Sequence, residues 1–399
     1  MKTGFIYFAG LTVLMSTSAI AQHRSITFEH GSFAEIKAKA LKENKLIFID
    51  AFTTWCGPCK QMAKNVFTND TVADYFNTNL VNAKIDMEKG EGLEIAKQYK
   101  VQCYPNLLFI DGNGNLVHRI AGSMSSSAFI AEANTAKNPE KRFSYYETNY
   151  DKNKQNSEFL VKYITAMSST CLEPGDAITQ YFSLQKESDL TSNQNWEMIK
   201  EHINSIEDKE FIYLVSHKKE FDNLYTEKEV DNKINKVNQN TLISVIRKKP
   251  FDQKIYDEKK SKISAMNLSG TKQVFFETDM FLAQKTGDLA TYTKLAVENV
   301  DLYYSNDPNK LNSIAWDFYE KVADKDALIK AESWAKKASE IEGSYPPLDT
   351  YAALLYKNGK KQLALETANK AIEAAKKEEY PKEDYQGTID LLKKIKEMK

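Results

Sequence analysis

Between residues 25 and 136, short apolar runs alternate with segments of helical periodicity. The clearest run is Leu-Ile-Phe-Ile-Asp-Ala-Phe at 46–52, whose polar flanks and nearly continuous apolar character predict a buried strand. Three further strands are predicted, at 80–85, 106–111 and 116–120. Four helices are predicted around them, at 33–43, 58–65, 93–99 and 126–135. This alternation favours an α/β domain, a central mixed sheet flanked by helices.

After Pro139 the strand pattern ends, and apolar residues recur at three- and four-residue spacing between lysines and glutamates. This pattern is typical of amphipathic helices, which we expect to pack as antiparallel pairs. Helical segments are predicted at 157–169, 176–187, 193–205, 207–221, 227–237, 239–247, 252–265, 275–284 and 289–300. The sequence therefore predicts an all-helical domain over 139–399.

Two stretches near the C-terminus repeat each other. Ala331 and Ala338 lie seven residues apart on one predicted helix, and Ala364 and Ala371 keep this spacing 33 residues later. The offset is close to the 34-residue period of tetratricopeptide repeats. We therefore expect helical hairpins of tetratricopeptide type at about 311–376, a kind of scaffold that can hold a protein partner.

The first 21 residues have a different character. Lys2 gives a positive start, residues 5–15 form a short apolar run, and Ala-Ile-Ala at 19–21 offers a cleavage site. This is the layout of a secretory signal peptide, and its apolar run is shorter than the roughly 20 residues that span a bilayer. We expect an exported protein, with the periplasm as the favoured compartment, that does not span the membrane after cleavage.

The composition excludes several classes of protein. Lys and Arg number 54 against 55 Asp and Glu, so no basic field attracts nucleic acid. Four cysteines among 399 residues are too few for a disulfide scaffold. No second cysteine pair or histidine stands at metal-ligand spacing, so we expect neither a metal site nor a bound cofactor.

The chemistry-bearing motif is Cys56-x-x-Cys59, between the predicted buried strand and the following helix. A cysteine at a helix N-terminus faces unpaired backbone N–H groups and the positive end of the helix dipole, which stabilise its thiolate. We therefore expect Cys56 to attack a substrate disulfide and Cys59, one turn later, to resolve the mixed disulfide. The redox-active disulfide itself would be the only redox group.

Residues 25–136 resemble the thioredoxin superfamily, whose Trp-Cys-Gly-Pro-Cys signature is intact at 55–59. The resemblance implies a thioredoxin-like domain over 22–138. It implies that Asp50 is a buried carboxylate that takes a proton from Cys59, and that Pro105 is a cis-proline beside the redox pair. Gly122 matches the glycine that follows the last strand. The residues implied to position substrate are Trp55, Gly57, Pro58, Tyr104 and Pro105.

The sequence departs from thioredoxins proper at several positions. Lys64 stands where a proline is usual, five residues after the second cysteine, and Asn106 stands where threonine usually follows the cis-proline. The lysine that often partners the buried aspartate aligns with Asn82, although Lys84 shares its strand face. These departures concern the proton relay and leave the dithiol chemistry intact.

Two cysteines leave alternatives open. Cys103, two residues before Pro105, fits a passive residue at the rim of the site or an auxiliary thiol that forms a mixed disulfide or a dimer link. Cys171 ends an apolar helical segment and fits a small buried hydrophobe. A Cys103–Cys171 bridge between the two domains is the third alternative.

The leading hypothesis is an exported thiol–disulfide oxidoreductase that reduces or isomerises disulfides in protein substrates. The Gly-Pro pair between the cysteines resembles reducing members of the superfamily, and the resemblance implies a membrane dithiol partner as the source of electrons. The alternative hypothesis is a helical scaffold whose tetratricopeptide-like domain holds a protein partner, with the redox domain secondary.

Overall fold

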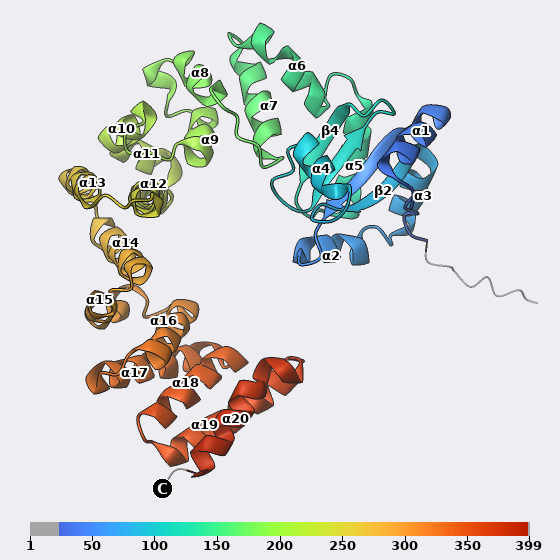
Figure 1. Cartoon of the computed structure of the whole chain (residues 1–399). Coiled ribbons are helices and arrows are strands. Elements are labelled where there is room, and N and C mark those ends of the chain that lie inside the picture. Colours follow the sequence, from blue (N-terminus) through green and yellow to red (C-terminus); the bar gives the residue numbers. More distant parts are fainter. Residues whose placement is uncertain (1–23, 398–399) are drawn as a thin grey trace, which may run out of the picture. The chain divides into compact units, whose positions relative to one another are not determined.

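The computed structural model of the chain describes residues 24–397 (Figure 1). The expected leader at 1–21 lies outside the described residues. The chain divides into two compact units, Met1–Glu187 and Ser188–Lys399. The first unit is larger than the thioredoxin-like segment expected at 22–138, because helices that follow this segment pack onto its sheet.

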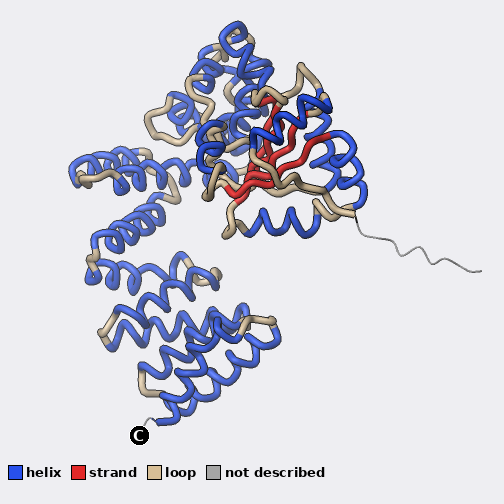
Figure 2. The backbone as a smooth tube through the Cα atoms, turned by 45° about the vertical axis from the view of Figure 1, so that its right-hand side comes forward, coloured by secondary structure: helices blue, strands red, loops and turns tan. Residues whose placement is uncertain are grey.

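A mixed sheet of four strands lies at the centre of the first unit, among its described residues (red in Figure 2). The strands are β1 (Leu46–Phe52), β2 (Leu80–Asp86), β3 (Asn106–Ile110) and β4 (Leu116–Ala121). Their spatial order is β2-β1-β3-β4, with β1 parallel to β2 and the other neighbours antiparallel. The predicted α/β class with a mixed sheet is confirmed.

Helices α1 to α5 accompany the sheet: α1 (Phe33–Glu43), α2 (Gly57–Asn65), α3 (Asp70–Asn79), α4 (Gly92–Gln98) and α5 (Ser126–Lys137). Periodicity did not predict α3, whose sequence is rich in threonine, asparagine and aromatic residues of modest helix propensity. The Asn69 side chain caps this helix, and Val72 and Phe76 anchor it in the core.

The two faces of the sheet bury different clusters, since side chains alternate along each strand. On one face Phe48 packs among aromatic rings, including Phe76 and Phe129, which stack with their centroids 4.2 Å apart. On the other face Ile47 and Ile49 belong to a mainly aliphatic cluster. Burial on both faces explains the nearly continuous apolar run of β1.

Three helices extend the first unit beyond the expected domain boundary: α6 (Phe143–Asn153), α7 (Ser157–Ser168) and α8 (Ala177–Ser183). Helix α6, which periodicity did not predict, contacts β4 and α7. The N–H of Ala121 at the end of β4 donates to the carbonyl of Ser169, just after α7, at 3.0 Å. This extension covers part of β4, the outer strand of the sheet, whose backbone groups would otherwise face solvent.

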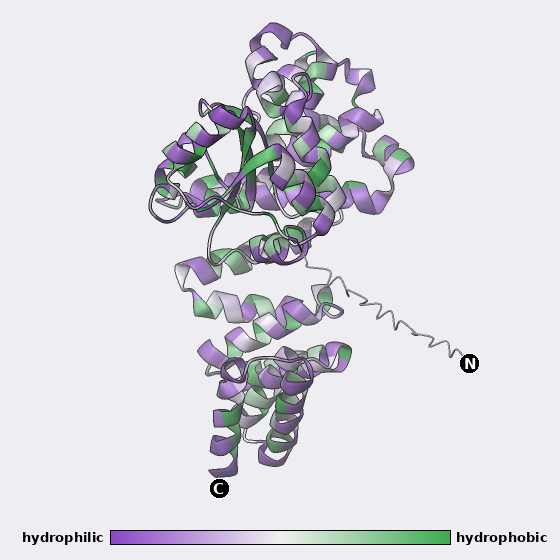
Figure 3. Cartoon of the chain, turned by 90° about the vertical axis from the view of Figure 1, so that its right-hand side faces the viewer, coloured by the Kyte–Doolittle hydropathy of each residue, from purple (hydrophilic) through white to green (hydrophobic). Residues whose placement is uncertain are grey.

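The second unit is built of helices over its described residues, which confirms the predicted helical C-terminal region. They are α9 (Asn193–His202), α10 (Lys209–Ser216), α11 (Lys218–Tyr225), α12 (Glu227–Arg247), α13 (Gln253–Ala265), α14 (Thr271–Thr286), α15 (Leu289–Tyr303), α16 (Pro308–Lys321), α17 (Lys325–Glu342), α18 (Tyr345–Lys357), α19 (Lys361–Lys377) and α20 (Gln386–Glu397), with a short 3₁₀ segment at Lys382–Tyr385. Another 3₁₀ segment, Glu187–Asp189, begins at the last residue of the first unit. Hydrophobic and hydrophilic residues alternate around them (Figure 3).

Three predicted segments in this unit had wrong boundaries. The single helix expected at 207–221 is divided at His217 into α10 and α11, because His217 leaves the helical conformation. The two helices expected at 227–237 and 239–247 form one continuous helix, α12, whose buried face runs through Val237 and Thr241.

The alanines of the repeated stretches are fully buried. Ala331 and Ala338 lie on α17, and Ala364 and Ala371 lie on α19. Helix α17 packs against α16, and α19 packs against α18 and α20. Small residues at these positions let neighbouring helices approach closely, and the tetratricopeptide assignment at 311–376 stays a prediction.

Candidate active site

The two cysteines of the motif lie at the N-terminus of α2. Cys56 is the N-cap residue, and Cys59 lies in the first turn of the helix. Their sulfurs form a disulfide with an S–S distance of 1.99 Å and a Cα–Cα distance of 5.3 Å. The backbone N–H of Cys59 donates to Cys56 Sγ at 3.1 Å. The sulfur of Cys56 therefore occupies the position of a helix cap, where a negative charge is stabilised.

The redox pair lies beneath an exposed rim. Cys56 and Cys59 are each only 2% exposed, whereas Trp55 is 65% exposed. Gly57 and Pro58, between the two cysteines, are also exposed. An exposed aromatic ring beside a buried disulfide gives a large ligand an apolar surface at the point where the sulfurs are reached.

Trp55 is held by two neighbours from other parts of the chain. Its Nε1 donates to both carboxylate oxygens of Glu88, each at 3.0 Å. Its indole packs edge-on against the ring of Tyr104, with centroids 5.9 Å apart. Burial, together with the nearby Glu88 and Asp86, raises the pKa of Tyr104, so its hydroxyl stays protonated at neutral pH. Residue 104 thus lies beside the motif at 55–59.

The peptide bond between Tyr104 and Pro105 is cis. Pro105 is buried, and its carbonyl accepts a hydrogen bond from the N–H of Gly122 at 2.9 Å. Gly122 has φ of 92°, which a residue without Cβ adopts readily. The structure therefore brings together the proline and the glycine that the sequence singled out, while their part in binding substrate stays a prediction.

Asp50 is fully buried on β1. Nζ of Lys84, its partner on β2, lies 3.2 Å from Asp50 Oδ2. This contact is not aligned as a hydrogen bond, and neither carboxylate oxygen accepts one from the described residues. Burial raises the pKa of Asp50 to about 6, although Lys84 opposes the rise. A carboxyl of this kind can take or release a proton near neutral pH.

Lys84 provides the charge that the resemblance placed at Asn82. The Lys84 Nζ lies 4.8 Å from the centroid of the Phe52 ring, and its side chain is 30% exposed. Asn82 instead donates to the carbonyl of Thr27 at 3.4 Å and to Asn77 Oδ1 at 3.3 Å. Lys84 rather than Asn82 is the partner of Asp50 because the parallel register of β1 and β2 places Lys84 opposite Asp50.

Of the alternatives for the remaining two cysteines, the structure contains the Cys103–Cys171 bridge. Cys103 and Cys171 form a disulfide, with an S–S distance of 2.10 Å and a Cα–Cα distance of 6.3 Å. Cys171 is exposed, so the interpretation as a small buried hydrophobe was wrong. Both cysteines belong to the first compact unit. In this state neither is a free thiol, and a role of Cys103 as an auxiliary thiol stays a prediction that requires reduction of this disulfide.

Arg119 on β4 is a residue near the site that the sequence analysis missed. Its buried guanidinium donates to the carbonyls of Tyr99, at 2.6 Å, and Lys100, at 3.3 Å. It also donates to Asn106 Oδ1 at 3.3 Å. Burial lowers the pKa of Arg119 to about 10, so it stays charged at neutral pH. Arg119 thus links the two ends of the segment that carries the cis-proline. A charged residue within the otherwise apolar predicted strand at 116–120 was the feature of the sequence that could have identified it.

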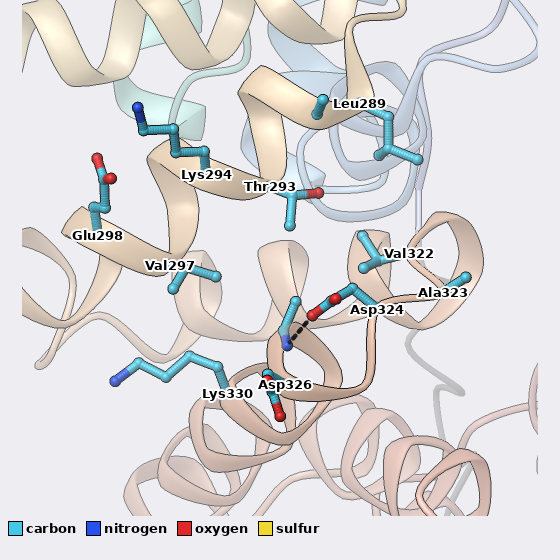
Figure 4. A pocket seen from close by; sticks show the side chains of 12 residues that line it. Leu289, Thr293, Lys294, Val297, Glu298, Val322, Ala323, Asp324, Asp326 and Lys330 are labelled. Carbon is cyan, nitrogen blue, oxygen red and sulfur yellow. Dashed lines mark hydrogen bonds between the residues drawn. The ribbon is translucent and has the colours of Figure 1, made fainter.

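The second unit holds a separate pocket of about 780 Å³ between α15 and the start of α17 (Figure 4). Its apolar lining includes Leu289, Val297, Val322 and Ala327. Two of its charged residues have structural partners: Asp324 Oδ1 accepts from the N–H of Ala327 at 2.8 Å, and Lys330 pairs with Asp301. The lining of this pocket is mainly apolar.

Over residues 24–397, no group of histidine, cysteine and carboxylate side chains is placed to hold a metal ion. Within the same residues, no helix combines the length and the apolar character that crossing a bilayer requires.

Comparisons with known proteins concern the first unit. The family model for thioredoxin matches residues 27–135. Thioredoxin-1 of Drosophila melanogaster is 38% identical over 74 residues, which are 18% of this chain and 64% of that protein. The thiol:disulfide interchange protein DsbD of Tatumella citrea is 28% identical over 116 residues, which are 28% of this chain and 20% of that protein. The chain thus spans less than two thirds of each of these curated relatives.

A solved structure gives a similar match in sequence. A candidate disulphide isomerase from Bacteroides thetaiotaomicron is 47% identical, and the match covers 29% of this chain and 97% of that one, with a TM-score of 0.28.

Proposed function

Because residues 27–135 form a thioredoxin-family domain, we propose that this chain is a thiol–disulfide oxidoreductase whose exchanging pair is Cys56 and Cys59. One observation carries the proposal: the Cys56 sulfur caps α2 and accepts the N–H of Cys59, next to an exposed Trp55. Helix-end stabilisation makes Cys56 the attacking thiolate, and the 5.3 Å between the two Cα atoms lets Cys59 resolve the intermediate.

The reaction starts from the reduced pair. The Cys56 thiolate attacks one sulfur of a substrate disulfide, forms a mixed disulfide and releases the other substrate sulfur as a thiolate. Cys59 then loses its proton and attacks Cys56 Sγ, which releases the second substrate thiol. Two electrons pass to the substrate, and the enzyme ends with the Cys56–Cys59 disulfide.

Asp50 is the proposed proton acceptor for Cys59. A carboxylate with a pKa of about 6 is ionised at pH 7 and still basic enough to take a thiol proton transiently. Lys84, at 3.2 Å, stabilises the ionised carboxylate and connects it toward solvent through its partly exposed side chain. Trp55, Gly57, Pro58, Tyr104 and Pro105 would position the substrate around the reacting sulfur.

The substrates are proposed to be proteins, and the direction to be reduction or isomerisation. A reducing enzyme needs electrons, and an exported one would take them from a membrane dithiol partner. The similarity to a thiol:disulfide interchange protein supports such a relay. Export to the periplasm rests on the leader pattern at 1–21.

A second candidate function is a scaffold in which the helical unit holds a protein partner that the redox pair serves. The apolar pocket between α15 and α17 favours it. The partner's class is a protein, since stacked helical hairpins present extended surfaces of the size that proteins recognise. In this case the redox domain would be secondary.

Trapping on the full chain tests the oxidoreductase. In the Cys59→Ser variant the mixed disulfide on Cys56 cannot be resolved, so substrate proteins should stay attached until dithiothreitol releases them. The matched control is Cys56→Ser/Cys59→Ser, which should trap nothing. If the Cys59→Ser variant traps no more protein than this control, the proposed function is wrong. If cells that carry only the control variant behave like cells with the wild-type protein and unlike cells that lack it, the scaffold function is favoured instead.

A further inference from the structure

The loop that carries the cis-proline is fastened to the helical extension of the first unit. Cys103 lies in this loop, and Cys171 lies in the turn after α7. The hydrogen bond from Ala121 to Ser169 joins the same turn to the end of β4 at 3.0 Å. The disulfide therefore connects the expected substrate loop to a segment outside the thioredoxin family match at 27–135.

The two ends of this loop have independent anchors. Arg119 donates to the carbonyls of Tyr99 and Lys100 before the loop, and to Asn106 after it. The Gly122 N–H holds the carbonyl of Pro105. Only the middle of the loop depends on the disulfide, and Tyr104, which contacts the Trp55 ring, immediately follows Cys103.

The Cys103–Cys171 disulfide is placed where an attacking thiolate can approach it. Cys171 is exposed, and Cys103 is partly exposed. Cys171 also has φ of 58°, a left-handed conformation that is unfavourable for a residue with Cβ. Opening the disulfide would free this residue to leave that conformation, whereas a purely structural bridge is typically sealed from exchange.

We propose that Cys103–Cys171 is a second thiol–disulfide exchange site, and that its reduction releases the substrate loop and weakens binding of protein disulfides at Cys56. The control of binding rests on the proposed function, whereas the exchange itself does not. With the disulfide closed, Tyr104 is held in place for substrate. With it open, the middle of the loop moves while Arg119 and Gly122 keep both ends in place.

The exchange needs a dithiol as reductant, and a second reduced copy of this chain can provide it. Cys56 of the second copy attacks the Cys171 sulfur as a thiolate, forms an intermolecular disulfide and releases Cys103 as a thiolate. Cys59 of the second copy then attacks its own Cys56 and releases Cys171. Two electrons pass from the donor pair, which becomes a disulfide, and its two protons balance the new thiols.

The first test measures exchange without the catalytic pair. The full-length Cys56→Ala/Cys59→Ala variant is equilibrated with graded ratios of reduced to oxidised dithiothreitol, and free thiols are alkylated and located by mass spectrometry. We expect Cys103 and Cys171 to be reduced in the folded protein, at a ratio within about tenfold of that which reduces Cys56–Cys59 in the wild type. Reduction only after the circular dichroism of the folded chain is lost would overturn the proposal.

The second test measures substrate binding in the full-length Cys103→Ser/Cys171→Ser variant, with Ser169→Ala as the matched control in the same turn. We expect the KM for a protein disulfide to rise by about threefold to tenfold while kcat stays within about twofold, because only the positioning of substrate is lost. An unchanged KM would contradict control of the loop. If the wild type itself does not reduce the protein disulfide, the proposed function is wrong, whereas the result of the first test on exchange at Cys103–Cys171 is unaffected.

Discussion

Lys84 lies directly opposite Asp50 on the neighbouring parallel strand, and its Nζ is 3.2 Å from Asp50 Oδ2. Asp50 is fully buried, and its carboxyl has a pKa of about 6 because burial outweighs the attraction of Lys84. An acid whose pKa is raised in the folded state destabilises that state when it ionises. The ionised, buried Asp50 carboxylate therefore costs stability at neutral pH, a cost that Lys84 only partly offsets, and it keeps a base inside the redox domain.

The first prediction follows from this cost. The folded pKa of about 6 lies above the ordinary value of 3.8, so wild-type stability falls as pH rises from about 4 through 6. Asp50→Asn cannot ionise and should raise the free energy of unfolding by about 3 kcal/mol at pH 8 and by less than about 1 kcal/mol at pH 4. The free energy of unfolding at each pH is measured by urea denaturation, with amide hydrogen exchange in β1 as the probe. An equal gain at both pH values would refute the buried charge as its cause.

The second prediction concerns Lys84. Because Lys84 lowers the pKa of Asp50, Lys84→Met should raise that pKa above about 6. An NMR titration of the Asp50 carboxyl carbon measures the change directly. Lys89→Met is the control, because Lys89 pairs with Asp86 at the surface, 3.2 Å away. A shift of equal size in the control would mean that general surface charge, not the ion pair, sets the pKa of Asp50.

The third prediction concerns the nucleophile. In the reduced protein, we expect the rate at which iodoacetamide alkylates Cys56, at the N-cap of α2, to reach half its maximum at a pH well below about 8.5, the pKa of an ordinary cysteine. Cys59, inside the helix, should react more slowly. The rates are measured in Cys59→Ser and Cys56→Ser variants respectively. An ordinary titration of Cys56 would show that the helix end does not activate it.

The fourth prediction separates the two contacts of Trp55. Trp55→Phe keeps an aromatic ring against Tyr104 but loses the hydrogen bonds to Glu88, whereas Trp55→Ala loses both. We expect KM for a protein disulfide to rise by about tenfold in Trp55→Ala and by at most about threefold in Trp55→Phe. Steady-state insulin reduction measures both. Equal effects of the two substitutions would assign the loss to the Glu88 contact instead.

The fifth prediction concerns Arg119. Replacing it by methionine keeps an apolar stem but leaves the carbonyls of Tyr99 and Lys100 without their donor, and should destabilise the first unit by about 3 kcal/mol. Arg119→Lys retains the charge but not the forked geometry, so it should recover only part of the loss. Chemical denaturation gives both values. Full recovery by lysine would show that charge alone matters here.

Local patterns were sufficient for much of the first unit. The apolar run at β1 predicted the central strand, because burial on both faces leaves no room for alternation. The motif at 55–59 placed the cysteines at the start of a helix, which is where α2 begins. Helix α3 was missed because the Asn69 cap and tertiary packing, rather than propensity or clear periodicity, stabilise it. Helix α6 has no side-chain cap and was missed because packing against β4 and α7 stabilises it.

The sequence by itself determined most of the strands and helices and the redox pair, since these depend on residues that are neighbours along the chain. The tertiary structure decided the partners. Strand register paired Lys84 rather than Asn82 with Asp50. The turn after α7, hydrogen-bonded to the end of β4, brought Cys171 to Cys103 across 68 positions. Contacts of this kind depend on how separate elements are aligned in space, which no short pattern of residues encodes.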